Sequence, residues 1–184
     1  MGTENETLRY AVGEAMLGTI LVATSDQGVA AILIGDDAGK MTRELRQGFA
    51  HAALTEDAAG LADTLAKVSA FVDAPHTGLD LPLDLRGTAQ ELAVWEALRA
   101  IPSGETRTYG QIAKVLPVAA TAQEVGAACA ANRIAVAVPC HRVVKADGGI
   151  AGYRWGVHRK RRLIERERAA ARAGAGGLFA GRAD

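Results

Sequence analysis

The sequence predicts two domains of different class: a small α/β domain over residues 1–86 and a mostly helical domain over residues 87–171. Strand-like apolar runs lie in the first part of the chain, and three helix-capping motifs follow Arg86. The charge also changes sign, because residues 1–84 carry 5 Lys/Arg against 13 Asp/Glu, whereas residues 85–168 carry 14 against 7. A basic second half favours an anionic partner, although basic helices can equally be solvated faces. Residues 172–184 are expected to form a flexible tail.

The composition excludes several other classes of protein. A hydrophobic content of 49% in 184 residues is enough for a packed core. No apolar run approaches the roughly 20 residues that cross a bilayer, and Met1–Glu6 is polar, unlike a signal peptide. The two cysteines, Cys129 and Cys140, suggest no disulfide framework, and no metal-ligand spacing is visible. We therefore expect a cytoplasmic protein with no metal, no cofactor and no membrane partner.

The first domain is expected to be a small antiparallel sheet with helices. Strand patterns occupy residues 18–24, 29–34 and 79–85, and helical patterns occupy residues 42–49 and 58–72. A turn at Asp26-Gln27-Gly28 indicates a hairpin between the first two strands, and Pro82 favours an edge position for the third. No polar cluster in this domain is suited to chemistry, so we interpret it as a support.

Capping boxes organise the second domain, which begins after Arg86-Gly87. The pattern Ser/Thr-x-x-Glu/Gln occurs at Thr88, Thr108 and Thr121, and each instance predicts the start of a helix. The first helix carries Leu92, Trp95 and Leu98 on one face. The second ends before Pro117 and the third runs to Asn132. This short pair, with an Ala/Gly-rich second member, is typical of a helix-turn-helix, whose small residues can approach either another helix or DNA.

A glycine-rich loop over residues 150–157 precedes a strongly charged helix over residues 158–171. Helical spacing puts Leu163, Ile164 and Glu167 on its buried edge. The alternative for Glu167 is a solvent-exposed salt bridge with Lys160 or Arg166.

Cys140 and His141 form the most reactive pair in the chain. The apolar run over residues 134–138 predicts a buried strand that Pro139 stops, which puts Cys140 at a strand-to-loop corner. A thiol with a reference pKa of about 8.5 needs a nearby base to act as a nucleophile. Neighbouring side chains in a strand point apart, so a water bridge between the two is favoured over direct contact. The alternative is an inert buried thiol beside a surface histidine.

Several segments together resemble the O6-alkylguanine-DNA alkyltransferases, and within that family the C-terminal half of the bacterial Ada regulators. These segments are 95–98, 101–106, 108–109, 125–126, 131–132, 138–144, 152–156 and 163–167. The resemblance is strong over residues 88–167 and loose over the first eighty. It implies a ribonuclease H-like first domain and a helix-turn-helix whose second helix enters the minor groove of DNA. It also implies repair of double-stranded DNA by single transfer of an alkyl group from O6-alkylguanine, or O4-alkylthymine, to Cys140.

The resemblance also implies roles for individual residues. Cys140 would accept the alkyl group, His141 would remove its proton through water, and Glu167 would hold His141. Tyr109 would donate a proton to the departing guanine and Asn132 would tie down the reactive loop; a packing aromatic and a helix C-cap are their alternatives. The pocket wall would contain Val143, Tyr153 and Arg154, and the DNA contacts would involve Thr108, Ala122, Gln123 and Gly126. For Arg142 a structural ion pair is expected.

The sequence departs from the family pattern at Gln123, where many members carry an arginine that fills the gap left by the rotated base. Glutamine lacks the cation that attracts phosphate, so weaker DNA affinity or slower base extrusion is expected. The zinc ligands of human-type members and the cysteine-rich metal domain of the Ada regulators have no counterpart here.

Three other functions are compatible with parts of the sequence. A non-catalytic protein that recognises alkylated bases would keep the fold without the chemistry, and a helix-turn-helix regulator would leave Cys140, His141 and Glu167 unexplained. A cysteine hydrolase would share the thiol and imidazole but would turn over many times, whereas a thioether product cannot be hydrolysed. We expect a monomer that reacts once.

Overall fold

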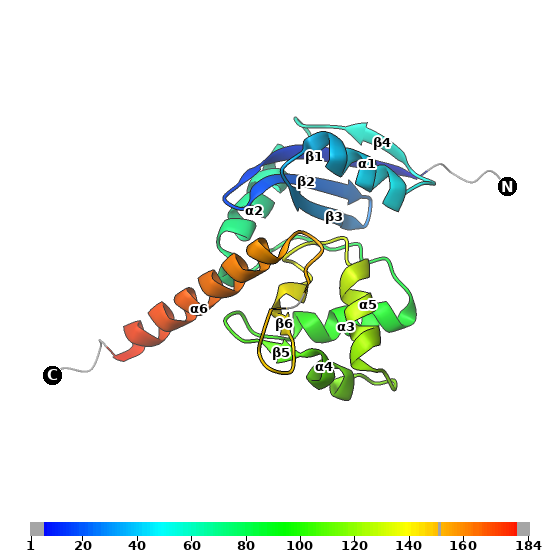
Figure 1. Cartoon of the computed structure of the whole chain (residues 1–184). Coiled ribbons are helices and arrows are strands. Elements are labelled where there is room, and N and C mark those ends of the chain that lie inside the picture. The colour runs from blue at the N-terminus through cyan, green and yellow to red at the C-terminus, as the bar shows by residue number, and fades with distance from the viewer. Residues whose placement is uncertain (1–5, 151, 180–184) are drawn as a thin grey trace. The chain divides into compact units, whose positions relative to one another are not determined.

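The computed structural model describes residues 6–150 and 152–179, which divide into two compact units (Figure 1). Unit 1 comprises Met1–Asp73, Leu79–Arg86 and Arg133–Ala135, and unit 2 comprises Ala74–Gly78, Gly87–Asn132 and Val136–Asp184. None of the described helices has both the length and the apolar character that a membrane crossing requires.

Unit 1 is built on a four-stranded sheet with the order β3-β2-β1-β4. The strands are β1 (Thr7–Ala15), β2 (Gly18–Ser25), β3 (Gly28–Gly35) and β4 (Ala53–Glu56). The predicted hairpin is confirmed as β2 and β3, which pair antiparallel. The prediction of a purely antiparallel sheet is wrong, because the edge strand β4 runs parallel to β1. Neither β1 nor β4 was expected from the apolar pattern.

Two helices pack on this sheet close to the predicted positions. Helix α1 (Ala38–Gly48) contacts β2 and β3, and helix α2 (Ala62–Asp73) contacts β1 and β2. The Asp37 side chain caps α1 by accepting a hydrogen bond from the backbone N–H of Lys40. The close approach of α2 to β1 depends on Gly13 in that strand, because a Cβ atom at this position would lie only 2.9 Å from the side chain of Leu65 in α2.

The predicted third strand over residues 79–85 is not a regular strand. Only Leu83 forms a bridge, to Val29 at the edge of β3. The backbone N–H of Val29 donates to the carbonyl of Pro82, and the N–H of Asp84 donates to the carbonyl of Val29. Because proline has no N–H to extend a ladder, the segment lies at the sheet edge, as Pro82 predicts, without continuous pairing.

Unit 2 is mostly helical. Its longer helices are α3 (Ala89–Arg99), α4 (Tyr109–Val115), α5 (Ala122–Ala131) and α6 (Val157–Phe179). Two 3-10 turns, η1 (Pro75–Thr77) and η2 (Cys140–Arg142), and two short parallel strands, β5 (Arg107–Thr108) and β6 (Val143–Val144), complete it. All three predicted capping boxes form with both of their hydrogen bonds, at Thr88, Thr108 and Thr121.

The small residues of α5 divide between two environments. On one side Ala128 is buried against α3, where its carbonyl accepts a hydrogen bond from the indole N–H of Trp95. On the other side Ala122 and Ala127 are exposed. The predicted apolar face of α3 is confirmed for Trp95 and Leu98, but Leu92 remains 36% exposed. One face of α5 therefore packs on another helix, and the opposite face stays open.

Two further predictions need correction. The apolar run over residues 134–138 is buried but is not a strand, since only Ile134 forms a bridge, with Ile32, and a turn follows. Helix α6 is longer than expected and continues through residues 172–179, so this part of the predicted flexible tail is helical. The end of that tail, residues 180–184, lies outside the described residues.

Candidate active site

The backbone around Cys140 is a tight turn, in which the N–H of Cys140 donates to the carbonyl of Val138 and the N–H of Arg142 donates to the carbonyl of Pro139. Val136 in this turn has φ = 66°, a left-handed conformation that costs a β-branched residue on the order of 1–3 kcal/mol. Pro139 then leads into η2, and β6 follows at once, pairing with β5 in the register Arg107↔Val143. Because β5 leads directly into α4, this pairing ties the cysteine turn to the helix that begins with Tyr109.

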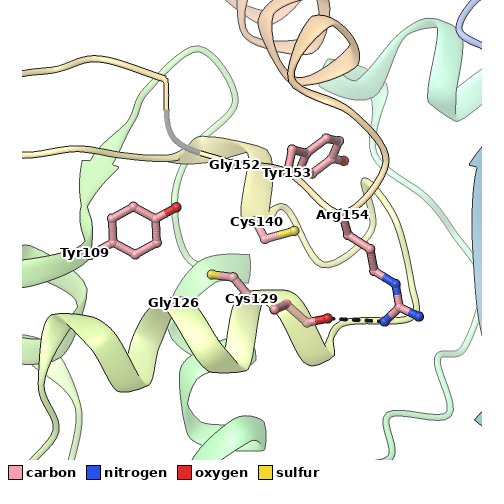
Figure 2. A pocket seen from close by; sticks show the side chains of 8 residues that line it. Tyr109, Gly126, Cys129, Cys140, Gly152, Tyr153 and Arg154 are labelled. Atoms are coloured by element: carbon pink, nitrogen blue, oxygen red, sulfur yellow. Dashed lines mark hydrogen bonds between the residues drawn. The ribbon is translucent and has the colours of Figure 1, made fainter.

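Cys140 lines a cavity of about 390 Å³ inside unit 2. The lining residues are Tyr109, Gly126, Cys129, Ala130, Cys140, Gly152, Tyr153 and Arg154. Figure 2 shows Tyr109 on one side of Cys140 and Tyr153 with Arg154 on the other, while α5 supplies Gly126 and Cys129. The structure thus brings together five residues that the sequence analysis assigned to the site: Tyr109, Gly126, Cys140, Tyr153 and Arg154.

A buried polar cluster lies next to this cavity. Nε2 of His141 is 2.8 Å from Oε1 of Glu167, and the exposed fractions of the two residues are 0% and 1%. Arg142 donates from Nε and Nη2 to the same carboxylate at 2.8–3.2 Å, and its Nη1 donates to the carbonyl of Ile101 at 2.7 Å. The predicted pairing of Glu167 with His141 is confirmed, as is the ion pair of Arg142. The alternative of a solvent-exposed salt bridge does not hold, because Glu167 is buried and its carboxylate is engaged by His141 and Arg142.

Burial and the neighbouring charges determine the protonation state of the His141 imidazole. Burial lowers the pKa of His141, and Glu167 only partly offsets this, so the ring is neutral at rest. Burial alone would raise the pKa of Glu167, but the hydrogen bonds from His141 and Arg142 outweigh it and lower that pKa to about 2. An ionised carboxylate can only accept, so Nε2 carries the hydrogen and Nδ1 keeps its lone pair. Within the described residues Nδ1 has no hydrogen-bond partner, which leaves it able to take a proton.

Asn132 links the end of α5 to the cysteine turn. Its side-chain amide donates to the carbonyl of Val138 at 3.0 Å and to Sγ of Cys140 at 3.4 Å. Burial raises the pKa of Cys140, and the hydrogen bond from Asn132 and the charges of Lys160 and Arg154 act in the opposite direction. The resting thiol is therefore protonated, and its activation requires a base.

Tyr109 is held as a neutral hydrogen-bond donor. Burial, followed by the nearby thiol groups of Cys129 and Cys140, raises its pKa to about 12. A phenol with this pKa keeps its proton at neutral pH and is available to donate it within the cavity.

Lys160 is a buried residue that the sequence analysis did not assign to the site. It is 0% exposed, and its Nζ has no hydrogen-bond partner within the described residues. This nitrogen lies 6.0 Å from the centre of the Tyr109 ring. Burial lowers the pKa of Lys160, and the neighbouring Cys140 and Cys129 act in the opposite direction. In the sequence Lys160 is one of several basic residues at the start of α6, and only its helical position, seven residues before Glu167, could have indicated an inward direction.

The remaining predicted site residues are placed as follows. Val143 is fully buried in β6 and is not among the residues that line this cavity, so its assignment to the pocket wall stays a prediction. Thr108 caps α4, with its hydroxyl accepting from the N–H of Gln111. Ala122 and Gln123 are exposed in the first turn of α5, whereas Gly126 faces the cavity.

Within the described residues no group of three or more His, Cys, Asp or Glu side chains is suited to hold a metal ion.

Several known proteins are similar to this chain. The family model for the 6-O-methylguanine DNA methyltransferase DNA binding domain matches residues 89–169. The chain is 45% identical over 166 residues to the bifunctional transcriptional activator/DNA repair enzyme Ada of Escherichia coli, covering 90% of this chain and 47% of that protein. It therefore spans about half the length of that relative.

Shorter relatives are covered more completely. The methylated-DNA–protein-cysteine methyltransferase of Mycobacterium tuberculosis is 43% identical over 119 residues, which is 65% of this chain and 72% of the relative. The crystal structure of the M. tuberculosis O6-methylguanine methyltransferase matches with a TM-score of 0.70 and 30% identity, covering 89% of this chain and 94% of that one. A structure of the M. tuberculosis protein in complex with DNA matches with a TM-score of 0.72 and 33% identity, covering 88% and 93%. On this evidence the chain belongs to the methylated-DNA–protein-cysteine methyltransferase family, which is also called the O6-alkylguanine-DNA alkyltransferase family.

Proposed function

We propose that this protein repairs DNA by transferring an alkyl group from O6 of guanine to Cys140, once per molecule. The observation that carries the proposal is the buried hydrogen bond between His141 and Glu167 beside a thiol that lines a cavity. A neutral imidazole with a free Nδ1 is the group that a protonated thiol needs, and the Glu167 carboxylate stabilises the imidazolium that forms.

The proposed step is a displacement at carbon. His141 takes the proton of Cys140 through a bridging water, and the thiolate attacks the alkyl carbon of the modified base. The sulfur–carbon bond forms as the carbon–oxygen bond breaks, and the electron pair of the broken bond stays on the guanine oxygen. Tyr109 supplies a proton to the departing guanine. The charge of Lys160 favours both the thiolate and the phenolate that remains on Tyr109, because both lie within its electrostatic reach.

The reaction consumes the protein. The product on Cys140 is a thioether, which is not an acyl group and does not leave as a stable anion, so water cannot restore the thiol. Each molecule therefore accepts one alkyl group, and the protein acts as a stoichiometric reagent.

The substrate base must leave the duplex to reach the cavity, which costs a few kcal/mol. Gly126 supports the presence of a base beside Tyr109. A glycine inside a helix costs about 1 kcal/mol relative to alanine, yet a Cβ atom at this position would lie 3.9 Å from the Tyr109 ring, an ordinary contact. The described protein itself thus gives no steric reason for the missing side chain, whereas a nucleobase held against Tyr109 does.

Helices α4 and α5 are proposed to act as a helix-turn-helix, with α5 in the minor groove of the DNA. The exposed small residues at the start of α5 permit close approach, and Thr108, Ala122 and Gln123 are the proposed contacts together with Gly126. That the M. tuberculosis relative forms a complex with DNA supports DNA as the partner. Unit 1 is proposed to be a ribonuclease H-like support. We further propose a monomer in the cytoplasm, where a reducing environment suits the two free cysteines.

Intact-protein mass spectrometry after incubation with duplex DNA that contains O6-methylguanine tests this proposal. The expected result is one added methyl group, mapped to Cys140, with no addition from unmodified duplex or in Cys140→Ser. Binding to the modified duplex without a mass change would contradict the proposal and indicate a recognition protein. Repeated turnover of an ester or amide would contradict it in favour of a hydrolase.

A further inference from the structure

We infer that Arg154 limits the size of the alkyl group that Cys140 accepts, because it fixes one wall of the cavity to the C-terminal end of α5. This inference rests on the proposed function and adds the property that decides which O6-alkylguanines are substrates. Arg154 is thereby a specificity-determining residue that acts by positioning the wall.

The wall in question is the segment Gly152–Trp155, called here the wall segment. Gly152, Tyr153 and Arg154 line the cavity opposite Tyr109. Tyr153 and Trp155 pack against each other edge to face, with ring centres 5.3 Å apart and planes at 71°, and Trp155 is buried. The two rings anchor the segment to the body of unit 2, while the Arg154 side chain is exposed and extends to α5.

Arg154 joins the wall segment to α5 by hydrogen bonds between parts of the chain that are far apart in sequence. Its Nη1 donates to the carbonyl of Asn132 at 2.8 Å and to the carbonyl of Ala130 at 3.3 Å, and the second contact is the dashed line in Figure 2. Carbonyls in the last turn of a helix lack partners within the helix, and they carry partial negative charge that attracts a guanidinium. The Arg154 side chain therefore holds the wall segment to the C-terminal end of α5.

Asn132 connects this contact to the acceptor thiol. Its backbone carbonyl accepts from Arg154, and its side-chain amide donates to Sγ of Cys140. Asn132 thus links the wall segment to the sulfur through two hydrogen bonds. Loss of the Arg154 contact frees the wall while leaving the hydrogen bond between Asn132 and Cys140 in place.

The direction of the thiol explains why this wall matters for the size of the alkyl group. In Figure 2 the sulfur of Cys140 points to the side where Tyr153 and Arg154 lie, away from Tyr109. In a displacement at carbon, sulfur, carbon and the leaving oxygen are in line, so the substituents on the carbon project sideways from that line. A methyl group projects only hydrogens, whereas a longer chain projects carbon atoms that meet the wall segment.

The test compares transfer of a methyl group and an n-butyl group from O6-alkylguanine in otherwise identical duplexes. Wild type, Arg154→Ala and Arg154→Lys are measured as single-turnover rates by intact mass. We expect the butyl-to-methyl rate ratio to rise at least tenfold in Arg154→Ala. It should rise less in Arg154→Lys, because a lysine can still donate to one carbonyl. The Arg154 charge also acts on the Cys140 thiol. Loss of this charge changes the methyl and butyl rates by the same factor, so its effect cancels from the ratio.

A second readout needs no DNA. The rates at which Cys140 reacts with iodoacetamide and with a bulky aryl maleimide are followed by peptide mapping in the same three proteins. The maleimide-to-iodoacetamide ratio should rise in Arg154→Ala in parallel with the butyl-to-methyl ratio. If both ratios stay within twofold of wild type, the inference is wrong. If wild type accepts no methyl group from DNA, the proposed function fails, and the thiol-probe ratio alone then decides whether Arg154 holds the wall.

Discussion

The two units bury different kinds of side chain. Among the described residues, all six buried polar or charged side chains belong to unit 2: Asn132, His141, Arg142, Arg159, Lys160 and Glu167. The fully buried side chains of unit 1 that fill its sheet and helices, such as Leu21, Ile32 and Leu45, are apolar. Burying a charge costs several kcal/mol unless it is paired, and the apolar core of unit 1 avoids this cost. Unit 2 differs in that it buries charged side chains, and it does so next to the thiol that needs a base.

Truncation of a buried side chain in each unit gives the largest expected effects. Glu167→Ala leaves Arg142 buried without its carboxylate and should lower the free energy of unfolding by about 3–5 kcal/mol. Leu45→Ala, which creates a cavity in the apolar core of unit 1, should lower it by about 2–5 kcal/mol. Urea unfolding measures both. The two variants differ in chemistry, because only Glu167→Ala should lose methyl transfer under conditions where both proteins are folded.

Acid should weaken the protein through Glu167. Its pKa is about 2 in the folded state against an ordinary value of 4.5, so its ionised form is favoured by folding. The stabilisation is complete above about pH 4.5 and is lost as the pH falls from 4.5 towards 2, and it amounts to roughly 3 kcal/mol. Urea unfolding at a series of pH values should show a shallower decline in Glu167→Gln than in wild type. Parallel curves for the two proteins would contradict the assignment.

Lys160 should affect stability and chemistry in opposite directions. Its ammonium group is buried without a hydrogen-bond partner among the described residues, a condition that costs about 1–3 kcal/mol. Lys160→Met keeps the length of the side chain and removes this cost, so thermal unfolding should show a rise in stability of about 1 kcal/mol. The rate of methyl transfer should fall at the same time. A variant that is both less stable and fully active would refute the proposed role of this cation.

Gln123→Arg should have the smallest effect, and it tests the exposed face of α5. The residue is exposed in the first turn, and Glu124 beside it is already engaged by Thr121 in the capping box. An added guanidinium should strengthen binding to duplex DNA several-fold at low salt and accelerate methyl transfer by up to about tenfold. Gln123→Lys serves as a control for charge alone. No change in either binding or rate would show that this position does not contact the DNA.

Sequence patterns predicted the parts of the fold that depend on local chemistry. The three capping boxes depend on residues three positions apart, and all of them form at Thr88, Thr108 and Thr121. Long-range pairing was not predictable in the same way. Strand β1 holds charged residues and Gly13 between its apolar positions, and β4 is only four residues long, so both are recognisable only from the strands that they pair with.

In the site, too, the features that depend on local sequence were predictable, whereas the long-range contacts were not. The pairing of Glu167 with His141 followed from the helical position of Glu167 and from the family resemblance, and the geometry bears it out at 2.8 Å. Lys160 was not predicted because it is one of several basic residues at the start of α6, and the Arg154 contact to α5 was not predicted because it joins residues more than twenty positions apart. The left-handed conformation of Val136, which replaces the expected strand with a turn, is likewise fixed by the surrounding fold and not by valine.

The central claim is that the neutral imidazole of His141 activates Cys140, and the pH dependence of methyl transfer in His141→Gln tests it directly. Removal of a general base should lower the single-turnover rate at pH 7 by about 10²–10⁴-fold. The rate should then recover as the pH rises towards the pKa of Cys140, which burial raises, because hydroxide can replace the missing base. In wild type the rate should stay constant well below pH 6.5, because burial lowers the pKa of His141 and keeps it in the basic form. A His141→Gln protein that transfers methyl groups at the wild-type rate at pH 7 would contradict the account.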